Sequence, residues 1–250
     1  MLYNANAIIM PCFLKSFEGE SMLKKTVQFF VLSAILVITV PAQAGWFGVD
    51  KAKPLPALEL KSGVMMPSAK VLPFFQQQLA QTQQAFYFSD QRGQPFGAQN
   101  FQKHWTLVFF GFTYCPMLCP TTMAQLNNAY QQLVKAQFTP LPQIVFMTID
   151  PARDKQKDLA KFIDAFNPHF IGLRTDNEKA LSEFARELDA AYEKVNGSGK
   201  DKDKKGQYTL THTGDIAVID PQGDLVALLT MPHTDKDIAA DYQAIIKKLT

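Results

Sequence analysis

Two cysteines separated by three residues are the part of the chain with the clearest chemical potential. Cys115 and Cys119 occur in the stretch Cys-Pro-Met-Leu-Cys-Pro, between an apolar run at 105–112 and a segment with helical periodicity after Pro120. The run predicts a buried strand, and proline suits the first position of a helix, so Cys119 is predicted to be the helix N-cap. Both sulfurs would then lie near the positive end of the helix dipole, which lowers a thiol pKa from about 8.5 toward roughly 3.5–7.5. The pair is therefore predicted to be thiolate.

The spacing of this pair leaves two kinds of chemistry open. Redox pairs of the thioredoxin type have two intervening residues, whereas this pair has three. The wider spacing permits a disulfide and also suits two sulfurs arranged around one metal ion. Two thiolates select Cu(I) or zinc, and a third ligand would have to come from elsewhere in the chain. Histidine is the usual supplier.

Four histidines are available as that third ligand. His104 and His169 fall in predicted loops, and His233 leads into the last predicted helix. His212 lies between a charged loop and the penultimate strand, so in a sheet with helices on both faces it can face the cysteine loop. Spacing alone leaves the choice open, and His212 is the candidate that we carry forward.

The N-terminal segment has the three-part layout of a secretory signal peptide. A basic start at 22–25 is followed by an apolar stretch and by Ala42-Gln-Ala44, a small-x-small cleavage site. Residues 1–21 do not fit in front of such a peptide and are interpreted as an upstream mis-start, so the signal peptide is assigned to 22–44. The alternative is a retained membrane anchor, although the apolar stretch is shorter than the roughly 20 residues of a spanning helix. Cleavage would remove Cys12, and a disulfide between the two remaining cysteines is allowed in the periplasm.

Composition and length are typical of one globular domain after this leader. The 250-residue chain is 47% hydrophobic and 19% charged, which does not fit a disordered protein. The formal net charge of +2 does not suggest nucleic acid as a partner, because that would need a clustered basic face. Residues 45–69 are predicted to be a linker, and residues 70–250 to form a single domain.

Strands alternating with helices predict an α/β domain with a mixed central sheet and helices on both faces. Further buried strands are expected at 143–149, 216–219 and 225–229, of which the last two form a hairpin. The glycine-rich charged segment at 196–206 is predicted to be a solvated loop. The remaining predictions are a strand and its return within 85–96, a Gln-rich turn or loop at 74–80, and helix starts at Asp154, Thr175 and Thr234.

Three separated motifs resemble the Sco/SenC family. Residues 110–122, Phe-Gly-Phe-Thr-Tyr-Cys-Pro-Met-Leu-Cys-Pro-Thr-Thr, look like its signature, and residues 148–154, Thr-Ile-Asp-Pro-Ala-Arg-Asp, resemble its second motif. His212, eight residues before Asp220, falls where that family has its metal-binding histidine. The resemblance runs over most of residues 85–250 and implies a thioredoxin-like fold in an exported or membrane-anchored copper-binding protein.

Carried over residue by residue, the resemblance implies that Cys115, Cys119 and His212 are the ligands of one copper ion, as Cu(I), Cu(II) or both. It implies a role in assembling the copper centre of cytochrome c oxidase, with the copper-site subunit of that enzyme or another periplasmic copper protein as partner. The expected location is the periplasm, with anchoring in the inner membrane, facing the periplasm, as the alternative. Many members of the family have Asp after the first Cys-Pro, whereas this chain has Met117.

Other activities remain open on the sequence. In the alternative function, a thiol–disulfide oxidoreductase that reduces the cysteines of a copper-site partner, the same two cysteines would be the redox-active pair. A thiol peroxidase on a related fold is a third possibility. A copper chaperone needs no catalytic residue, so the sequence leaves open whether the chain is an enzyme.

Overall fold

The computed structural model describes residues 59–70, 88–196 and 208–250. The predictions for the upstream mis-start, the signal peptide, the Gln-rich segment and nearly all of the charged loop fall outside these ranges. Within them, no helix combines the length and the apolar character needed to cross a bilayer.

A mixed sheet of eight strands forms the centre of the described structure. Its strands are β1 (Gly63–Lys70), β2 (Phe88–Asp90), β3 (Pro95–Phe96), β4 (Thr106–Gly111), β5 (Gln143–Thr148), β6 (Ile171–Arg174), β9 (Ile216–Ile219) and β10 (Asp224–Leu229). Their order is β1-β10-β9-β4-β5-β6-β2-β3, with β4, β5 and β6 parallel and the other neighbours antiparallel. Because β4 and β5 are covered on both faces, they appear in the sequence as continuous apolar runs. The predicted strands at 105–112 and 143–149 are confirmed.

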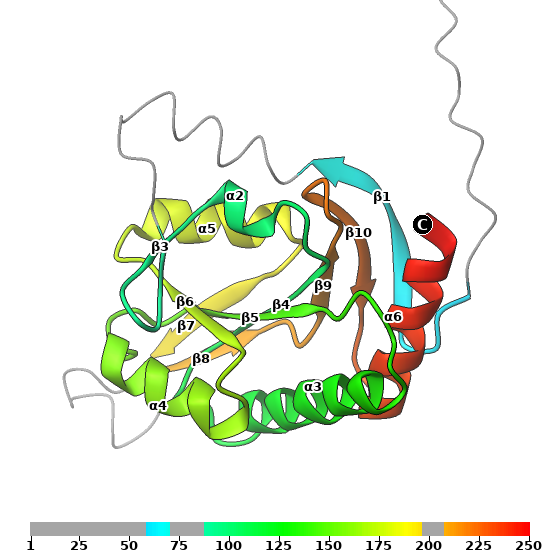
Figure 1. Ribbon diagram of the computed structural model, residues 1–250. Coiled ribbons are helices and arrows are strands. Elements are labelled where there is room, and N and C mark those ends of the chain that lie inside the picture. Colours follow the sequence, from blue (N-terminus) through cyan, green and yellow to red (C-terminus); the bar gives the residue numbers. More distant parts are fainter. Residues whose placement is uncertain (1–58, 71–87, 197–207) are drawn as a thin grey trace, which may run out of the picture. The chain divides into compact units, whose positions relative to one another are not determined.

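Helices cover both faces of this sheet, as predicted. They are α2 (Ala98–Phe101), α3 (Leu118–Lys135), α4 (Gln156–Phe166), α5 (Glu178–Glu187) and α6 (Asp235–Leu249). Figure 1 shows α3 and α4 on one face and α2 and α5 on the other, and α6 packs against α3. The predicted mixed sheet between two helical layers is therefore confirmed.

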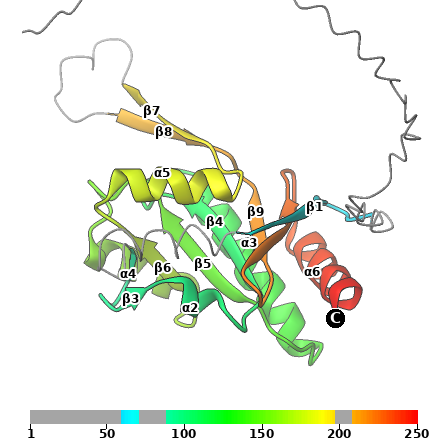
Figure 2. The ribbon, with the colours of Figure 1, turned by 90° about the horizontal axis from the view of Figure 1, so that it is seen from above.

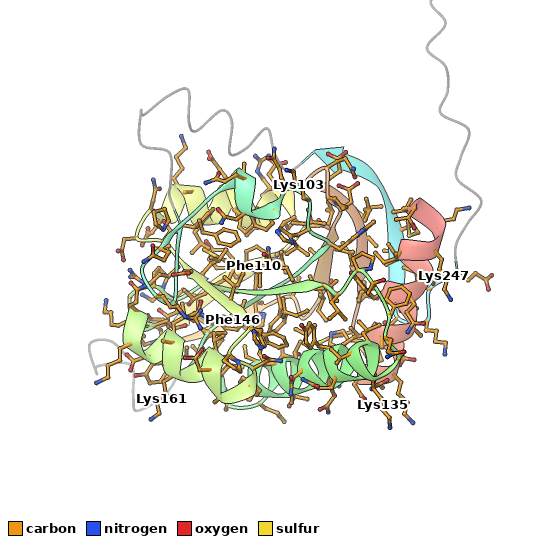
Figure 3. All side chains as sticks on the ribbon, in the orientation of Figure 1. Lys103, Phe110, Lys135, Phe146, Lys161 and Lys247 are labelled. Carbon is orange, nitrogen blue, oxygen red and sulfur yellow. The ribbon has the colours of Figure 1, made fainter. Side chains whose placement is uncertain are left out.

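Aromatic side chains fill both layers between the sheet and the helices. Phe110 of β4 packs against Phe184 of α5 with ring centroids 5.6 Å apart, whereas Phe146 of β5 packs on the other face against Phe162 of α4 at 5.3 Å. Figure 3 shows Phe110 and Phe146 in the interior and Lys161 among the side chains that point outward. Each buried ring stabilises the fold by about 1.5–3 kcal/mol. The packing on both faces holds the carboxyl ends of β4 and β5 in place. The cysteine loop begins at the carboxyl end of β4.

A second sheet, which the sequence did not predict, consists of β7 (Tyr192–Asn196) and β8 (Tyr208–His212) in antiparallel pairing. Figure 2 shows this ribbon standing apart from the main sheet, beside α5. At the end of β8 the backbone N–H of Thr213 donates to the carbonyl of Ala191 at 2.9 Å, and the chain then enters β9 of the main sheet. The ribbon is thus tied to the sheet at the end that carries His212.

Helix α3 begins earlier than predicted. Met117 is its N-cap and Leu118 its first residue, so the prediction that Cys119 is the N-cap is wrong. Pro120 stands at the third helical position, where its missing N–H still costs nothing because the first four N–H groups of a helix have no partner within the helix.

Two further helix starts differ from prediction by a residue or two. Asn177, whose side chain accepts from the backbone N–H of Ala180, caps α5 in place of Thr175. Lys155, not Asp154, is the N-cap of α4. The predicted start of α6 at Thr234, the hairpin of β9 and β10, and the strand β2 with its return β3 are confirmed.

The outermost strand, β1, lies in the segment interpreted as a linker. It pairs with β10, and just before it the backbone N–H groups of Lys61 and Ser62 donate to the carboxylate of Asp241 in α6 at 2.6 and 2.8 Å. The ordered sheet therefore begins earlier than residue 70. This strand was not predicted because glycine and proline, here Gly63 and Pro67, are unfavourable within strands.

Candidate metal centre

Cys115, Cys119 and His212 come together beside the carboxyl end of β4. Their ligand atoms all lie within 4.8 Å of one another, and this is the one cluster of three or more potential metal-ligating His, Cys, Asp or Glu side chains in the part of the chain that the structure describes. Sγ of Cys119 lies 3.4 Å from Nε2 of His212, although the two residues are 93 positions apart. The three residues predicted as ligands thus meet at one point, which is the geometric condition for holding one metal ion.

The loop after β4 and the first turn of α3 position the two cysteines. The backbone N–H of Cys119 donates to Sγ of Cys115 at 3.4 Å, so the sulfur serves as acceptor for one of the unpaired N–H groups of the first turn. The Cys119 side chain points back against β4, where Gly111 leaves room for it: a Cβ at Gly111 would lie 2.8 Å from Sγ of Cys119. Cys119 is fully buried and Cys115 is half-buried; both are free thiols.

The two thiols differ in their environment, and burial is the main influence on the pKa of Cys119. Burial raises the pKa of the Cys119 thiol far above its ordinary value, the nearby Cys115 adds to the rise, and a hydrogen bond from the Phe112 backbone opposes it. The prediction of a thiolate pair is therefore wrong for Cys119, because loss of solvation outweighs the helix dipole there. Without a metal ion Cys119 is a neutral thiol at neutral pH, and a bound cation must displace its proton.

His212 presents one ring nitrogen to the cysteines. Its Nδ1 lies 2.7 Å from the carbonyl oxygen of Thr213, which assigns the proton to Nδ1 and leaves the lone pair of Nε2 directed toward Cys119. Burial lowers the pKa of His212, so the imidazole is neutral at neutral pH. The rings of Phe109 and Phe112 meet the imidazole edge-on, with centroids 5.9 Å away in both cases. His212 is thus held in the tautomer and orientation that a metal ligand needs.

An open depression lies beside His212 on the two-stranded ribbon. It has a volume of about 550 Å³ and is also lined by Ala191, Tyr192, Glu193, Thr211 and Thr213. Neither cysteine lines this depression; Cys119 is fully buried and Cys115 is half-buried.

The other three histidines are not part of this cluster. His104 and His169 are exposed in loops, as predicted. His233 precedes α6, as predicted, and is buried, with its Nε2 3.1 Å from the carbonyl oxygen of Gly214.

Three large uncharged side chains are exposed near the cluster. Tyr114 and Met117, on either side of Cys115, are 61% and 72% exposed, and Met231 is 50% exposed. Met231 lies over Gly214, since a Cβ at Gly214 would fall 2.0 Å from its sulfur. The residue that departs from the family pattern, Met117, is therefore an exposed apolar side chain beside the thiols.

Asp154 supports the cysteine loop instead of capping a helix. Its buried carboxylate accepts hydrogen bonds from the backbone N–H and the hydroxyl of Thr113, at 2.9 and 2.6 Å, and from the hydroxyl of Thr148 at 2.6 Å. Thr113 begins the cysteine loop and Thr148 ends β5, so Asp154 joins the two.

Asp150 joins a different pair of elements. Its carboxylate forms an ion pair with Arg153 and accepts a hydrogen bond from the hydroxyl of Tyr208 at the start of β8. Neither Arg153 nor Tyr208 is a candidate functional residue on the sequence alone. The signal for Arg153 was present in the Asp-Pro-Ala-Arg-Asp motif, whereas Tyr208 stands next to the charged loop in a strand that was not predicted.

Known proteins are similar to the part of the chain that contains this cluster. The sequence profile of the SCO1/SenC family matches residues 75–247. An SCO2-like protein of Rickettsia typhi is 32% identical over 155 residues, which cover 62% of this chain and 73% of that protein. Protein SCO2 homolog, mitochondrial, of Danio rerio is 30% identical over 154 residues, which cover 62% of this chain and 53% of that protein. The chain therefore matches between about half and three quarters of the length of these relatives.

The solved structures add similarity at the level of the fold. The structure of Bradyrhizobium japonicum ScoI with copper bound is 28% identical, with a TM-score of 0.54, over 63% of this chain and 95% of that one. The predicted thioredoxin-like fold is thereby confirmed. The matched segment 75–247 contains both cysteines, His212 and the Asp150–Asp154 segment.

Proposed function

The chain belongs to the SCO1/SenC family, and we propose that it is an exported copper chaperone in which Cys115, Cys119 and His212 bind one copper ion. The observation that carries this proposal is the meeting of two sulfurs and one imidazole nitrogen within 4.8 Å. A site of this kind holds copper strongly enough to carry it and leaves a position open for an incoming ligand.

The donor set fits copper in both oxidation states. Thiolate is a soft ligand that favours Cu(I), whereas imidazole suits both Cu(I) and Cu(II). The neutral His212 offers Nε2 without having to lose a proton, so the protons that binding must release come from the thiols, among them that of the buried Cys119. The copper-bound state of the Bradyrhizobium japonicum structure supports copper as the metal.

Delivery to the copper centre of cytochrome c oxidase is the role that we propose for the loaded protein. The family resemblance supports this role, with the copper-site subunit of the oxidase or another periplasmic copper protein as the acceptor. The leader-like segment before residue 45 supports export to the periplasm, either as a cleaved signal peptide or as an anchor in the inner membrane. The partly exposed Cys115 is the ligand from which an acceptor would first take the ion.

Copper titration of the reduced protein tests the ligand assignment. Wild type should bind one copper, and His212→Ala should lose Cu(II) binding while retaining Cu(I) on the two sulfurs. His169→Ala is the matched control, because His169 is an exposed loop histidine whose ring has no role in the cluster. Unchanged Cu(II) affinity and absorption spectrum in His212→Ala would contradict the assignment.

A second function, thiol–disulfide oxidoreductase, is favoured by the asymmetry of the two thiols. Cys115 is accessible and Cys119 is buried directly behind it, which suits an attacking and a resolving thiol respectively. Cys115 would attack a partner's disulfide and release one of its thiols; Cys119 would then attack the mixed disulfide and release the second. The pair ends as a disulfide, and its two electrons and two protons end on the partner's cysteines.

Trapping separates this alternative from the chaperone. Cys119→Ser should accumulate a mixed disulfide through Cys115 with a copper-site protein if reduction is the function, and Cys115→Ser should not. Failure to trap any partner with Cys119→Ser, in cells where copper binding is intact in wild type, leaves the chaperone.

A further inference from the structure

We propose that Arg153 is a positioning residue that holds the histidine-bearing strand β8 against the cysteine loop, and that it thereby sets the Cu(II) affinity of the site. The inference rests on the proposed function, because it takes Cys115, Cys119 and His212 as the copper ligands. Arg153 itself belongs to neither ligand-bearing segment; it lies between β5 and α4.

The contacts of Arg153 with β8 are made at the first residue of the strand. Its Nη1 donates to the carbonyl of Tyr208 at 2.9 Å, and its guanidinium carbon lies 3.9 Å from the centroid of the Tyr208 ring. The Tyr208 hydroxyl donates to Asp150, which is also the ion-pair partner of Arg153. Just beyond the other end of β8, the backbone N–H of Thr213 donates to the carbonyl of Ala191, so the strand is anchored at both of its ends.

The same guanidinium contacts the cysteine loop. Its central carbon lies 5.8 Å from the ring centroid of Phe112 and 5.6 Å from that of Tyr114, distances at which a cation is attracted to an aromatic face. Phe112 in turn meets the imidazole of His212 edge-on. Arg153 is therefore in contact with aromatic residues of both ligand-bearing segments, and Phe112 continues the packing to His212.

Arg153 lies in an environment that is costly for a charged side chain. The Asp150 carboxylate with which it pairs is only 3% exposed, so the pair is not a surface contact weakened by solvent. Nη2 of Arg153 is buried and has no hydrogen-bond partner among the described protein atoms. Lysine could carry the charge, but it lacks the planar group that stacks on Tyr208 while donating to its carbonyl.

Loss of this contact should affect the two oxidation states differently. Both cysteines are positioned by β4, Gly111 and the first turn of α3, none of which is part of β8. His212 is positioned by β8 and by the ring of Phe112. Because two thiolates suffice for Cu(I) whereas Cu(II) binding draws on the imidazole, loosening β8 should weaken Cu(II) binding selectively.

The test is a set of titrations with Cu(I) and Cu(II) on the reduced, purified protein. Arg153→Met should lower Cu(II) affinity by about 10- to 100-fold, the range found when a residue that orients a metal ligand is removed. Its Cu(I) affinity should be that of wild type. Arg153→Lys should also lose Cu(II) affinity, and Tyr208→Phe, which keeps the stacked ring, should lose less. Arg92→Met, at an exposed arginine of the β2–β3 turn, is the matched control and should bind both ions as wild type does.

A metal-free measurement tests the mechanism directly. Hydrogen–deuterium exchange of the β8 amides should be faster in Arg153→Met than in wild type, with exchange in α3 unchanged. If Arg153→Met does not fold, as judged by circular dichroism and thermal unfolding, Arg153→Lys and Tyr208→Phe carry the same test.

The outcomes distinguish this inference from the proposed function. If His212→Ala loses Cu(II) binding but all folded Arg153 and Tyr208 variants keep wild-type Cu(II) affinity and β8 exchange, the positioning role is overturned and the ligand assignment stands. If His212→Ala keeps Cu(II) affinity, the ligand assignment itself fails. Equal loss of Cu(I) and Cu(II) affinity in Arg153→Met would also overturn the positioning role, since it would indicate general disruption of the site.

Discussion

Gly111 and Cys119 face each other so closely that a side chain at 111 has no room: a Cβ there would lie 2.8 Å from the Cys119 sulfur and 2.8 Å from the ring of Phe146. Real Cβ atoms do not approach other atoms this closely, so any other residue must displace the cysteine or the phenylalanine. The depth at which Cys119 is buried, and with it the raised pKa of the thiol, therefore depends on a residue that has no chemistry of its own.

Gly111→Ala should displace Cys119 and weaken copper binding. Forcing one methyl group into this packed contact should also lower the free energy of unfolding by about 1–3 kcal/mol. Gly172→Ala is the matched control, because its Cβ would meet Ile163 and Leu159 of α4 at 2.7 and 2.9 Å, away from the thiols. Chemical denaturation and Cu(I) titration should show a similar loss of stability in both variants and weaker copper binding only in Gly111→Ala. Equal copper affinity in the two would contradict the steric role of Gly111.

Copper affinity should rise with pH, and the buried thiol of Cys119 should contribute one proton to the slope. Because burial raises the pKa of Cys119, the metal-free thiol is protonated between about pH 6 and 8, and binding must release this proton. Cu(I) affinity should therefore increase about tenfold per pH unit from this proton alone. Burial lowers the pKa of His212, so the imidazole should add no pH dependence above its ordinary value of 6.5. Competition with a Cu(I) chelator measures the slope, which Cys119→Ser should reduce by one proton.

Met117→Asp should stabilise helix α3 and make the cysteines less reactive. The first turn of α3 contains no acidic residue, and a negative charge at a helix N-terminus contributes about 0.3–1 kcal/mol. The same charge disfavours thiolate at Cys115, two residues away, so alkylation by iodoacetamide should slow. Met117→Asn is the uncharged control of nearly the same shape. Alkylation as fast in the Asp variant as in the Asn variant would argue against an electrostatic effect of position 117 on the thiols.

Asp241→Ala should separate the β1 segment from the rest of the domain. The buried Asp241 carboxylate accepts hydrogen bonds from the backbone N–H groups of Lys61 and Ser62 and from the Ser62 hydroxyl. Leaving buried donors without an acceptor costs about 1–3 kcal/mol of stability. Thermal unfolding measures the loss, and Asp164→Ala, at a half-exposed aspartate, is the control. A melting temperature equal to that of the control would mean that the segment before β1 contributes nothing.

The sequence predicted the elements whose burial is complete. The segments 105–112 and 143–149 are recognisable as strands because both faces are covered, which makes their sequences continuously apolar. Thr234 is recognisable as a helix N-cap because its side chain accepts a hydrogen bond from the backbone of the first turn. The ribbon of β7 and β8 has no such signal, because it is short, half exposed and interrupted by a charged segment. A strand of this kind depends on tertiary contacts, here those of Tyr208, that no local pattern displays.

The three residues that meet in the cluster were candidates on the sequence, but their electrostatics could not be predicted from it. The cysteines stood out by type and spacing, whereas His212 was chosen through the family resemblance, since its proximity to Cys119 depends on how β8 folds back. The N-cap position failed because proline is tolerated throughout the first helical turn and does not mark a single residue. The thiolate prediction failed for Cys119 because burial, which the sequence does not display, opposes the helix dipole and exceeds it.

The 93 positions between Cys119 and His212 also impose an order in time. A chain is made from its N-terminus at about 5–20 residues per second, so both sulfurs exist for roughly 5–20 s before their histidine has been synthesised. During that interval the segment cannot offer the three-ligand cluster. Copper loading through all three residues is therefore confined to the time after His212 has been made and β8 has folded back onto the cysteine loop.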